Sequence, residues 1–172
     1  MASSLPRALG KFGLTTITRA TELRKQGKYQ ESRDLLQSLL ADDAFSAKAH
    51  LHVAWAYDNE GQERQAAPHY LAALEGALSP TERFDALLGL ASTYRSLGMY
   101  EEALAFFEHT MTEYPHSIEV QPFYAMCLYN TGRHKDATAL LLKLLVSTTK
   151  SDSIRSYRQA IELYAKDLDK TW

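Results

Sequence analysis

The stretch from Phe84 to Pro115, FDALLGLASTYRSLGMYEEALAFFEHTMTEYP, decides the expected fold. Its two halves each place apolar or small residues at steps of three and four, which predicts two amphipathic helices. The residues on these faces are Leu87, Leu90, Ala91 and Tyr94 in the first half and Tyr100, Ala103, Phe107 and Thr110 in the second. A turn is expected around Gly98, and Pro115 cannot continue a helix. Because two short helices cannot bury their apolar faces alone, the stretch predicts neighbours of the same kind.

Glycines mark these neighbours along the chain. Gly27, Gly61, Gly98 and Gly132 stand 34, 37 and 34 residues apart. Each follows one amphipathic segment and precedes another, as a helix C-cap in the left-handed conformation does. A period near 34 residues with helix–turn–helix content is typical of a stacked helical array.

In register with these glycines, the segments resemble the tetratricopeptide repeat (TPR) family, whose pattern places aromatic, Leu, Gly/Ala, Tyr, Gly, Ala and Pro residues at fixed positions. The third repeat carries Leu90, Ala91, Tyr94, Gly98, Tyr100, Ala103, Phe107 and Pro115. The second carries Val53, Ala54, Tyr57, Gly61, Ala66, Tyr70 and Ala73, with Glu63 at the usual aromatic position. The fourth keeps Tyr124, Ala125, Leu128, Gly132, Ala137 and Leu141, and the first, most divergent one keeps Ala20, Leu23, Gly27, Tyr29, Ser32 and Leu36. The resemblance covers about residues 14–150 and implies an all-α, right-handed superhelical stack of four TPR helix-turn-helix repeats.

Within that family, the length and the tail LYAKDLDKTW are similar to small, functionally uncharacterised bacterial TPR proteins of about this length. Dimerisation has been suggested for that group, so self-association is one expectation that the resemblance carries.

The pattern divides the chain into a flexible N-terminal tail (1–11), four TPR repeats (12–150) and a C-terminal capping helix (151–172). The repeats are expected at 12–45, 46–79, 80–116 and 117–150. Their helices are expected at about 12–26, 29–41, 46–60, 63–78, 80–96, 100–113, 117–131 and 134–148, followed by one at 153–169. Ser79 and Glu82 form a predicted capping box around Pro80, and Ser117 is a second predicted N-cap. In the last helix an apolar stripe is expected to cover the fourth repeat: Ile154, Tyr157, Ile161, Tyr164 and Leu168.

Composition excludes several classes of protein. Nineteen basic and twenty-one acidic residues give a net charge of −2, which argues against a nucleic-acid-binding surface. No apolar run approaches the roughly 20 residues that span a membrane, and the N-terminus lacks the apolar core of a signal peptide. A single cysteine, Cys127, fits a reducing compartment. The sequence therefore predicts a cytoplasmic protein without a nucleic-acid or membrane partner.

No residue pattern predicts catalysis or metal binding. His50 and His52 are two apart on a predicted helix and point in different directions, so they cannot share a metal ion. Pro115 interrupts the helix that would align Glu113 with His116. Phosphate loops, paired cysteines and nucleophile elbows are absent from the sequence. We therefore expect no enzyme, no cofactor and no metal.

The predicted binding site is the side of each first helix that faces away from its partner helix, which the resemblance places in the concave groove. Its residues in our prediction are Ile17, Lys48, Leu51, Trp55, Asp58, Asn59, Leu88, Ser92, Arg95, Met126, Tyr129 and Asn130. Thr21 and Arg24 share that side of the first repeat. Trp55, Leu88, Met126 and Tyr129 are candidate apolar anchors, the alternative being that neighbouring helices bury them.

These observations predict a non-enzymatic adaptor that holds a protein or peptide partner in the groove. The alternative is a homodimer that associates through the groove or the C-terminal helix. The family's carboxylate-clamp positions hold residues such as Ile17, Thr21 and Asp85, so an acidic C-terminal peptide is a poor candidate ligand.

Overall fold

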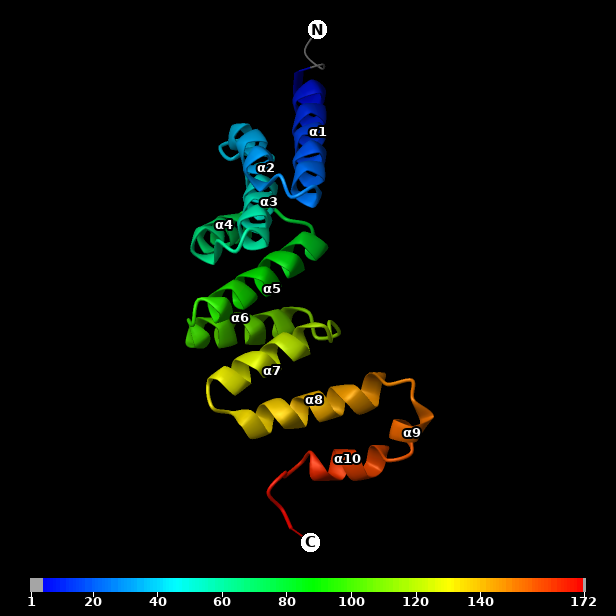
Figure 1. Ribbon diagram of the computed structural model, residues 1–172. Helices are drawn as coiled ribbons and strands as arrows, with labels where there is room; N and C mark the ends of the chain where they lie inside the picture. Colours follow the sequence, from blue (N-terminus) through cyan, green and yellow to red (C-terminus); the bar gives the residue numbers. More distant parts are fainter. Residues whose placement is uncertain (1–4, 172) are drawn as a thin grey trace. The chain divides into compact units, whose positions relative to one another are not determined.

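The computed structural model describes residues 5–171, with side chains from Gly10 onward. Every regular element in this range is a helix, and the helices are joined by short connections (Figure 1). The predicted all-α class is confirmed. The chain divides into two compact units, unit 1 ending at Gly98 and unit 2 beginning at Met99.

Unit 1 contains the two first repeats and the first helix of the third. Its elements are α1 (Leu5–Lys25), α2 (Tyr29–Leu36) with a 3-10 turn η1 (Gln37–Leu39), α3 (Ser46–Asn59), α4 (Glu63–Glu75) and α5 (Pro80–Ser96). Each helix packs on the next, and α3 also contacts both α1 and α5. Unit 1 therefore has the stacked arrangement predicted for consecutive helical hairpins.

Unit 2 continues the alternation of first and second helices. Its elements are α6 (Tyr100–Glu113), α7 (Val120–Asn130), α8 (His134–Thr148), α9 (Asp152–Arg155) and α10 (Arg158–Tyr164). Helix α7 packs against both α6 and α8, and α10 packs against α8.

The four turn glycines adopt the backbone conformation that the sequence predicts. Their φ angles lie between 73° and 79°, a region that only glycine enters without strain. Beyond Gly27, the N–H of Lys28 donates to the carbonyl of Leu23 at 2.9 Å, which closes a Schellman motif. The same bond follows Gly61 and Gly132. These turns end each first helix and reverse the chain into its partner.

The residues that carry the TPR pattern form the interior of each unit. Buried positions of the pattern include Ala20, Leu36, Val53, Ala66, Tyr70, Leu90 and Ala91 in unit 1 and Ala103, Phe107, Ala125, Leu128 and Ala137 in unit 2. In the divergent first repeat Ser32 replaces a small apolar residue, and its hydroxyl donates to the carbonyl of Ala20 at 2.7 Å. The substitution is accommodated because the buried hydroxyl has a hydrogen-bond partner.

Two predicted helix caps have different outcomes. At the start of α5 the capping box is present, because Ser79 Oγ accepts from the N–H of Glu82 and the Glu82 carboxylate accepts from the N–H of Ser79. Ser117 was predicted to open the fourth repeat, and this is wrong. Helix α7 begins at Val120, and its N-cap, Glu119, makes no side-chain capping bond.

The ends of the chain differ most from the prediction. Helix α1 begins at Leu5, so the first helix starts seven residues earlier than the predicted residue 12, while residues 1–4 lie outside the described range. A Cβ placed on Gly13 would stand 2.5 Å from the ring of Phe45, so the absent side chain allows α1 to pack against the start of the second repeat.

The single C-terminal helix expected at 153–169 is instead two short helices, α9 and α10. Ser156 Oγ donates to the carbonyl of Ser153 at 2.8 Å, and the N–H of Tyr157 closes a tight turn on Ile154 at 3.0 Å. Serine side chains compete in this way for helical carbonyl groups. Tyr157 and Tyr164 of the predicted covering stripe are exposed, so the stripe covers the fourth repeat only in part.

Candidate functional site

The predicted binding face in unit 1 lies on α1, α3 and α5. Two of its predicted members, Ile17 and Leu51, are buried. Ile17 packs in a core cluster with Leu36 and Val53. These two residues are therefore removed from the candidate surface, because their side chains are not accessible to a partner.

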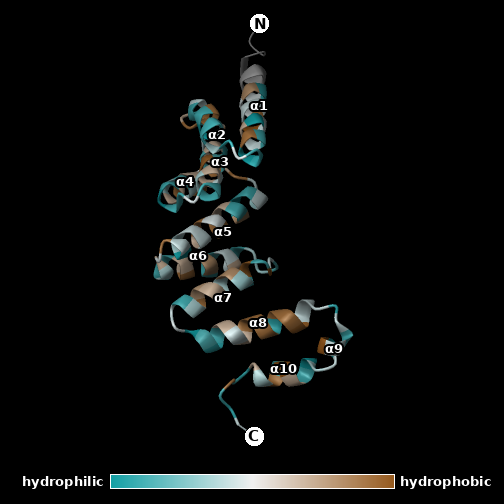
Figure 2. Cartoon of the chain, in the orientation of Figure 1, coloured by the Kyte–Doolittle hydropathy of each residue, from teal (hydrophilic) through white to brown (hydrophobic). Residues whose placement is uncertain are grey.

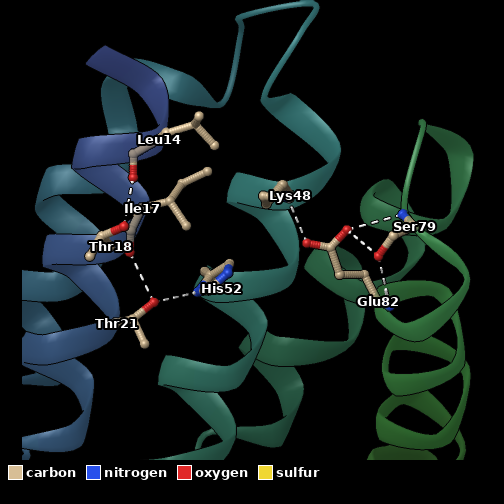
Figure 3. Close-up of polar contacts among 8 residues, drawn as sticks. All are labelled: Leu14, Ile17, Thr18, Thr21, Lys48, His52, Ser79 and Glu82. Carbon is tan, nitrogen blue, oxygen red and sulfur yellow. Dashed lines mark hydrogen bonds and ion pairs between the residues drawn. The ribbon is translucent and has the colours of Figure 1, made fainter. Parts of the chain in front are cut away.

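Polar and aromatic contacts join α1 to α3 on this face. Thr21 Oγ1 lies 3.3 Å from Nδ1 of the buried His52, as Figure 3 shows. One turn further along α1, Arg24 Nη1 donates to Asn59 Oδ1 at 3.0 Å. The Arg24 guanidinium also stands 5.2 Å from the ring centroid of Trp55, within the range of a cation–π interaction.

Trp55 is half-buried, and the edge of its ring meets His52 with 4.8 Å between the centroids. Burial, joined by the positive charges of Arg24 and Lys48, lowers the pKa of His52 to about 4. His52 is therefore neutral at pH 7 and serves as a packing and hydrogen-bonding group behind Trp55.

A second set of contacts joins α3 to α5. Lys48 Nζ pairs with Glu82 Oε1 at 2.9 Å, beside the capping box of α5 (Figure 3). Asp58 accepts from the Tyr70 hydroxyl at 2.6 Å and from Thr93 Oγ1 at 3.1 Å. The predicted groove residues Lys48 and Asp58 thus connect consecutive helices.

The predicted groove residues on α5 are less buried than Ile17 and Leu51. Leu88, Ser92 and Arg95 are all half-buried, at the side of α5 that the sequence assigns to the groove. Together with Trp55 and the exposed Asn59, they leave an amphipathic surface on unit 1.

In unit 2 the equivalent face of α7 is apolar and open to solvent. Met126 is 47% exposed and Tyr129 63% exposed, and the predicted groove residue Asn130 is exposed beside them. Phe123, which our prediction of the site omitted, is 39% exposed three residues before Met126. That spacing on a helix was the available signal for it.

The charge pattern of α7 distinguishes it from the other first helices. Residues 120–132 form the longest run of the chain without Asp, Glu, Lys or Arg. Figure 2 shows the resulting apolar colouring along α7, with hydrophilic residues at the turn to α8. Because an apolar helix face is normally buried, its exposure here indicates a contact surface.

A comparison with known protein families agrees with this architecture. A family model described as Tetratrico peptide repeat matches residues 47–168, which is well over half of the chain. The chain belongs to the tetratricopeptide repeat family. TPR repeats generally act as protein–protein interaction modules. A search of curated proteins found no match.

Metal binding would depend on the histidine and carboxylate side chains of this TPR chain. Within residues 5–171, no group of three or more His, Cys, Asp and Glu side chains could hold a metal ion. His50 and His52 point apart as predicted, since His52 meets Thr21 while His50 Nδ1 lies 2.8 Å from His69 Nδ1 on α4. None of the described helices is long and apolar enough to cross a membrane.

Proposed function

We propose that this TPR protein is a non-enzymatic adaptor that binds a segment of a protein partner on the groove-side faces of its first helices. The exposed apolar face of α7 carries this proposal, because Phe123, Met126 and Tyr129 are accessible without a charged residue among them. Large accessible apolar and aromatic side chains are typical of interface anchors. In unit 1, Trp55 and Leu88 are the corresponding candidates. A reducing, cytoplasmic location belongs to the same proposal.

The experiment compares partner capture by the full chain and by a variant that carries Met126→Glu and Tyr129→Glu. Both side chains are exposed, so the variant is expected to fold with unchanged helicity. We expect a partner recovered from the source cell with the natural protein to be lost with this variant. Leu145→Glu, at an exposed apolar position of α8, is the matched control and should leave capture unchanged. Equal capture by all three proteins would contradict the proposal.

Self-association is the second candidate function, and the C-terminal helices favour it. Tyr157 is 67% exposed, and Leu163 and Tyr164 on α10 are also exposed. A second copy of the chain would remove these side chains from water. Light scattering on the full chain tests this directly. A dimer that becomes a monomer with Tyr157→Glu and Tyr164→Glu would support it, whereas a monomer at all concentrations would exclude it.

A further inference from the structure

Arg24 is held differently from the arginines that form the ion pairs described next. A carboxylate lies within 4.0 Å of the guanidinium in Arg19, Arg33, Arg133, Arg155 and Arg158. Arg24 instead contacts the ring of Trp55 and the amide oxygen of Asn59, both neutral groups. Among the residues that the structure describes, no carboxylate forms an ion pair with Arg24.

The electrostatics of Arg24 agree with this geometry. Burial lowers the pKa of its guanidinium, and the phenols of Tyr70 and Tyr29 oppose this shift. The carboxylate of Asp58, near the same end of α3, is already bound by the hydroxyls of Tyr70 and Thr93. A half-buried cation without a counter-charge is a favourable position for an incoming anion.

The contacts also fix the orientation of the guanidinium. The central carbon of the guanidinium stands over the Trp55 ring, and Asn59 accepts from one of the terminal nitrogens. A guanidinium held by two contacts loses little conformational entropy when it binds a carboxylate with its remaining N–H donors. Arg24, Trp55 and Asn59, which we call the Arg24 cluster, all lie on the groove-side face of unit 1.

We propose that the Arg24 cluster recognises the carboxylate of an Asp or Glu side chain within the partner segment, next to an apolar residue that packs on Trp55. The inference rests on the proposed function and adds the chemistry of the partner at unit 1. It differs from the family's recognition of a free C-terminus, because the clamp positions hold residues such as Ile17, Thr21 and Asp85 and Arg24 is not one of them.

The probe is a random twelve-residue peptide library displayed on phage and selected against the full chain. We expect enrichment of peptides with an Asp or Glu beside an apolar residue. A synthetic peptide from this set is then measured by fluorescence anisotropy against the natural protein and Arg24→Gln. The variant should weaken binding by about 10- to 100-fold, the usual loss for a hydrogen bond to a charged group.

Two controls keep this result interpretable. Arg64→Gln, an identical change at an exposed position of α4, should leave the affinity unchanged. In the second control the acidic residue of the peptide is changed to its amide, Glu to Gln or Asp to Asn. Because the protein itself is unchanged, this control does not depend on whether Arg24→Gln folds. Added salt should weaken the binding of the acidic peptide more than the binding of its amide counterpart.

The outcomes separate the two proposals. Selected peptides that bind tightly, lack an acidic residue and are indifferent to Arg24→Gln would overturn the role of the Arg24 cluster and leave the adaptor function intact. An amide peptide that binds as well as its acidic parent would do the same. A library without any enriched peptide would overturn both proposals.

Discussion

The hydroxyl of Tyr70 on α4 donates a hydrogen bond of 2.6 Å to the carboxylate of Asp58 at the end of α3. Thr93 of α5 donates to the same carboxylate, so one partly buried acid connects three consecutive helices of unit 1. Burial raises the pKa of Asp58, and the two hydroxyl donors work against that rise. The TPR pattern supplies the aromatic residue at position 70, and its hydroxyl gives that residue a second role.

Removal of this hydroxyl should destabilise the protein. Tyr70→Phe keeps the buried ring and deletes the donor, so we expect the free energy of unfolding to fall by about 1–3 kcal/mol. Urea denaturation followed by circular dichroism measures this. Tyr129→Phe makes the same change at an exposed ring and should leave the midpoint where it is. A Tyr70→Phe protein as stable as the natural one would show that the bond contributes nothing.

Close packing at Gly89 gives a second prediction. A Cβ at this position would lie 2.7 Å from the Tyr70 ring and hydroxyl, which are buried and held by Asp58. Gly89→Ala should therefore cost about 1–3 kcal/mol of stability through overpacking. Gly10→Ala in α1 meets no atom within 4 Å and should raise stability slightly, because alanine favours a helix. Thermal unfolding measures both variants. A shift of both unfolding temperatures in the same direction would refute the packing argument.

The outcome at the two predicted N-caps can be tested in the same way. Ser79→Ala removes the Oγ that accepts from the N–H of Glu82 in a formed capping box, and it should destabilise the protein by about 1 kcal/mol. Ser117→Ala removes a side chain that caps no helix, and we expect a change well below that value. If the denaturant midpoint fell more for Ser117→Ala than for Ser79→Ala, our assignment of the α7 start would be wrong.

Stability should decrease in acid because of His52. Its pKa in the folded protein is about 4, below the ordinary 6.5, so the unfolded chain binds the proton more readily. The contribution of His52 is complete above about pH 6.5 and is lost as the pH falls toward 4, with a total of about 3 kcal/mol. The pKa values of His50 and His69 are also lowered by burial and act in the same direction, whereas that of Asp58 is raised and opposes them.

A comparison of variants isolates the His52 contribution. Unfolding free energies of the natural protein and His52→Gln are measured from pH 4 to pH 7.5, and their difference should shrink as the pH falls. His116→Gln, at an exposed position, should follow the natural curve. A His52→Gln protein with an unchanged pH profile would show that His52 is not buried as a neutral group.

Much of the fold followed from local patterns in the sequence. The turn glycines, the helices α5, α6 and α8, and the buried Ala and aromatic positions stood where the period and the capping residues predicted them. These features are predictable because a turn conformation or a helix face depends on residues close to one another in the chain. The interrupted C-terminal helix was missed, because Ser153 and Ser156 outweigh a regular apolar stripe in this segment.

The candidate site was predicted less completely. Helical spacing placed Lys48, Trp55, Asp58, Met126 and Tyr129 on one side of their helices. It could not distinguish an exposed residue from one that bridges to the next helix. Ile17 and Leu51 proved to be buried. Lys48 and Asp58 proved to bind Glu82 and Thr93 of the next repeat, which spacing within one helix does not reveal.

The sequence by itself determined a family of stacked helical hairpins, since the 34-residue period and the buried small residues leave no other way to shield the apolar faces. Only the tertiary structure decided which groove-side residues remain available. Arg24 lies over the Trp55 ring and donates to Asn59, and α7 keeps apolar side chains exposed. The physical reason is that accessibility and charge compensation are set by contacts between residues of different repeats, which no local spacing encodes.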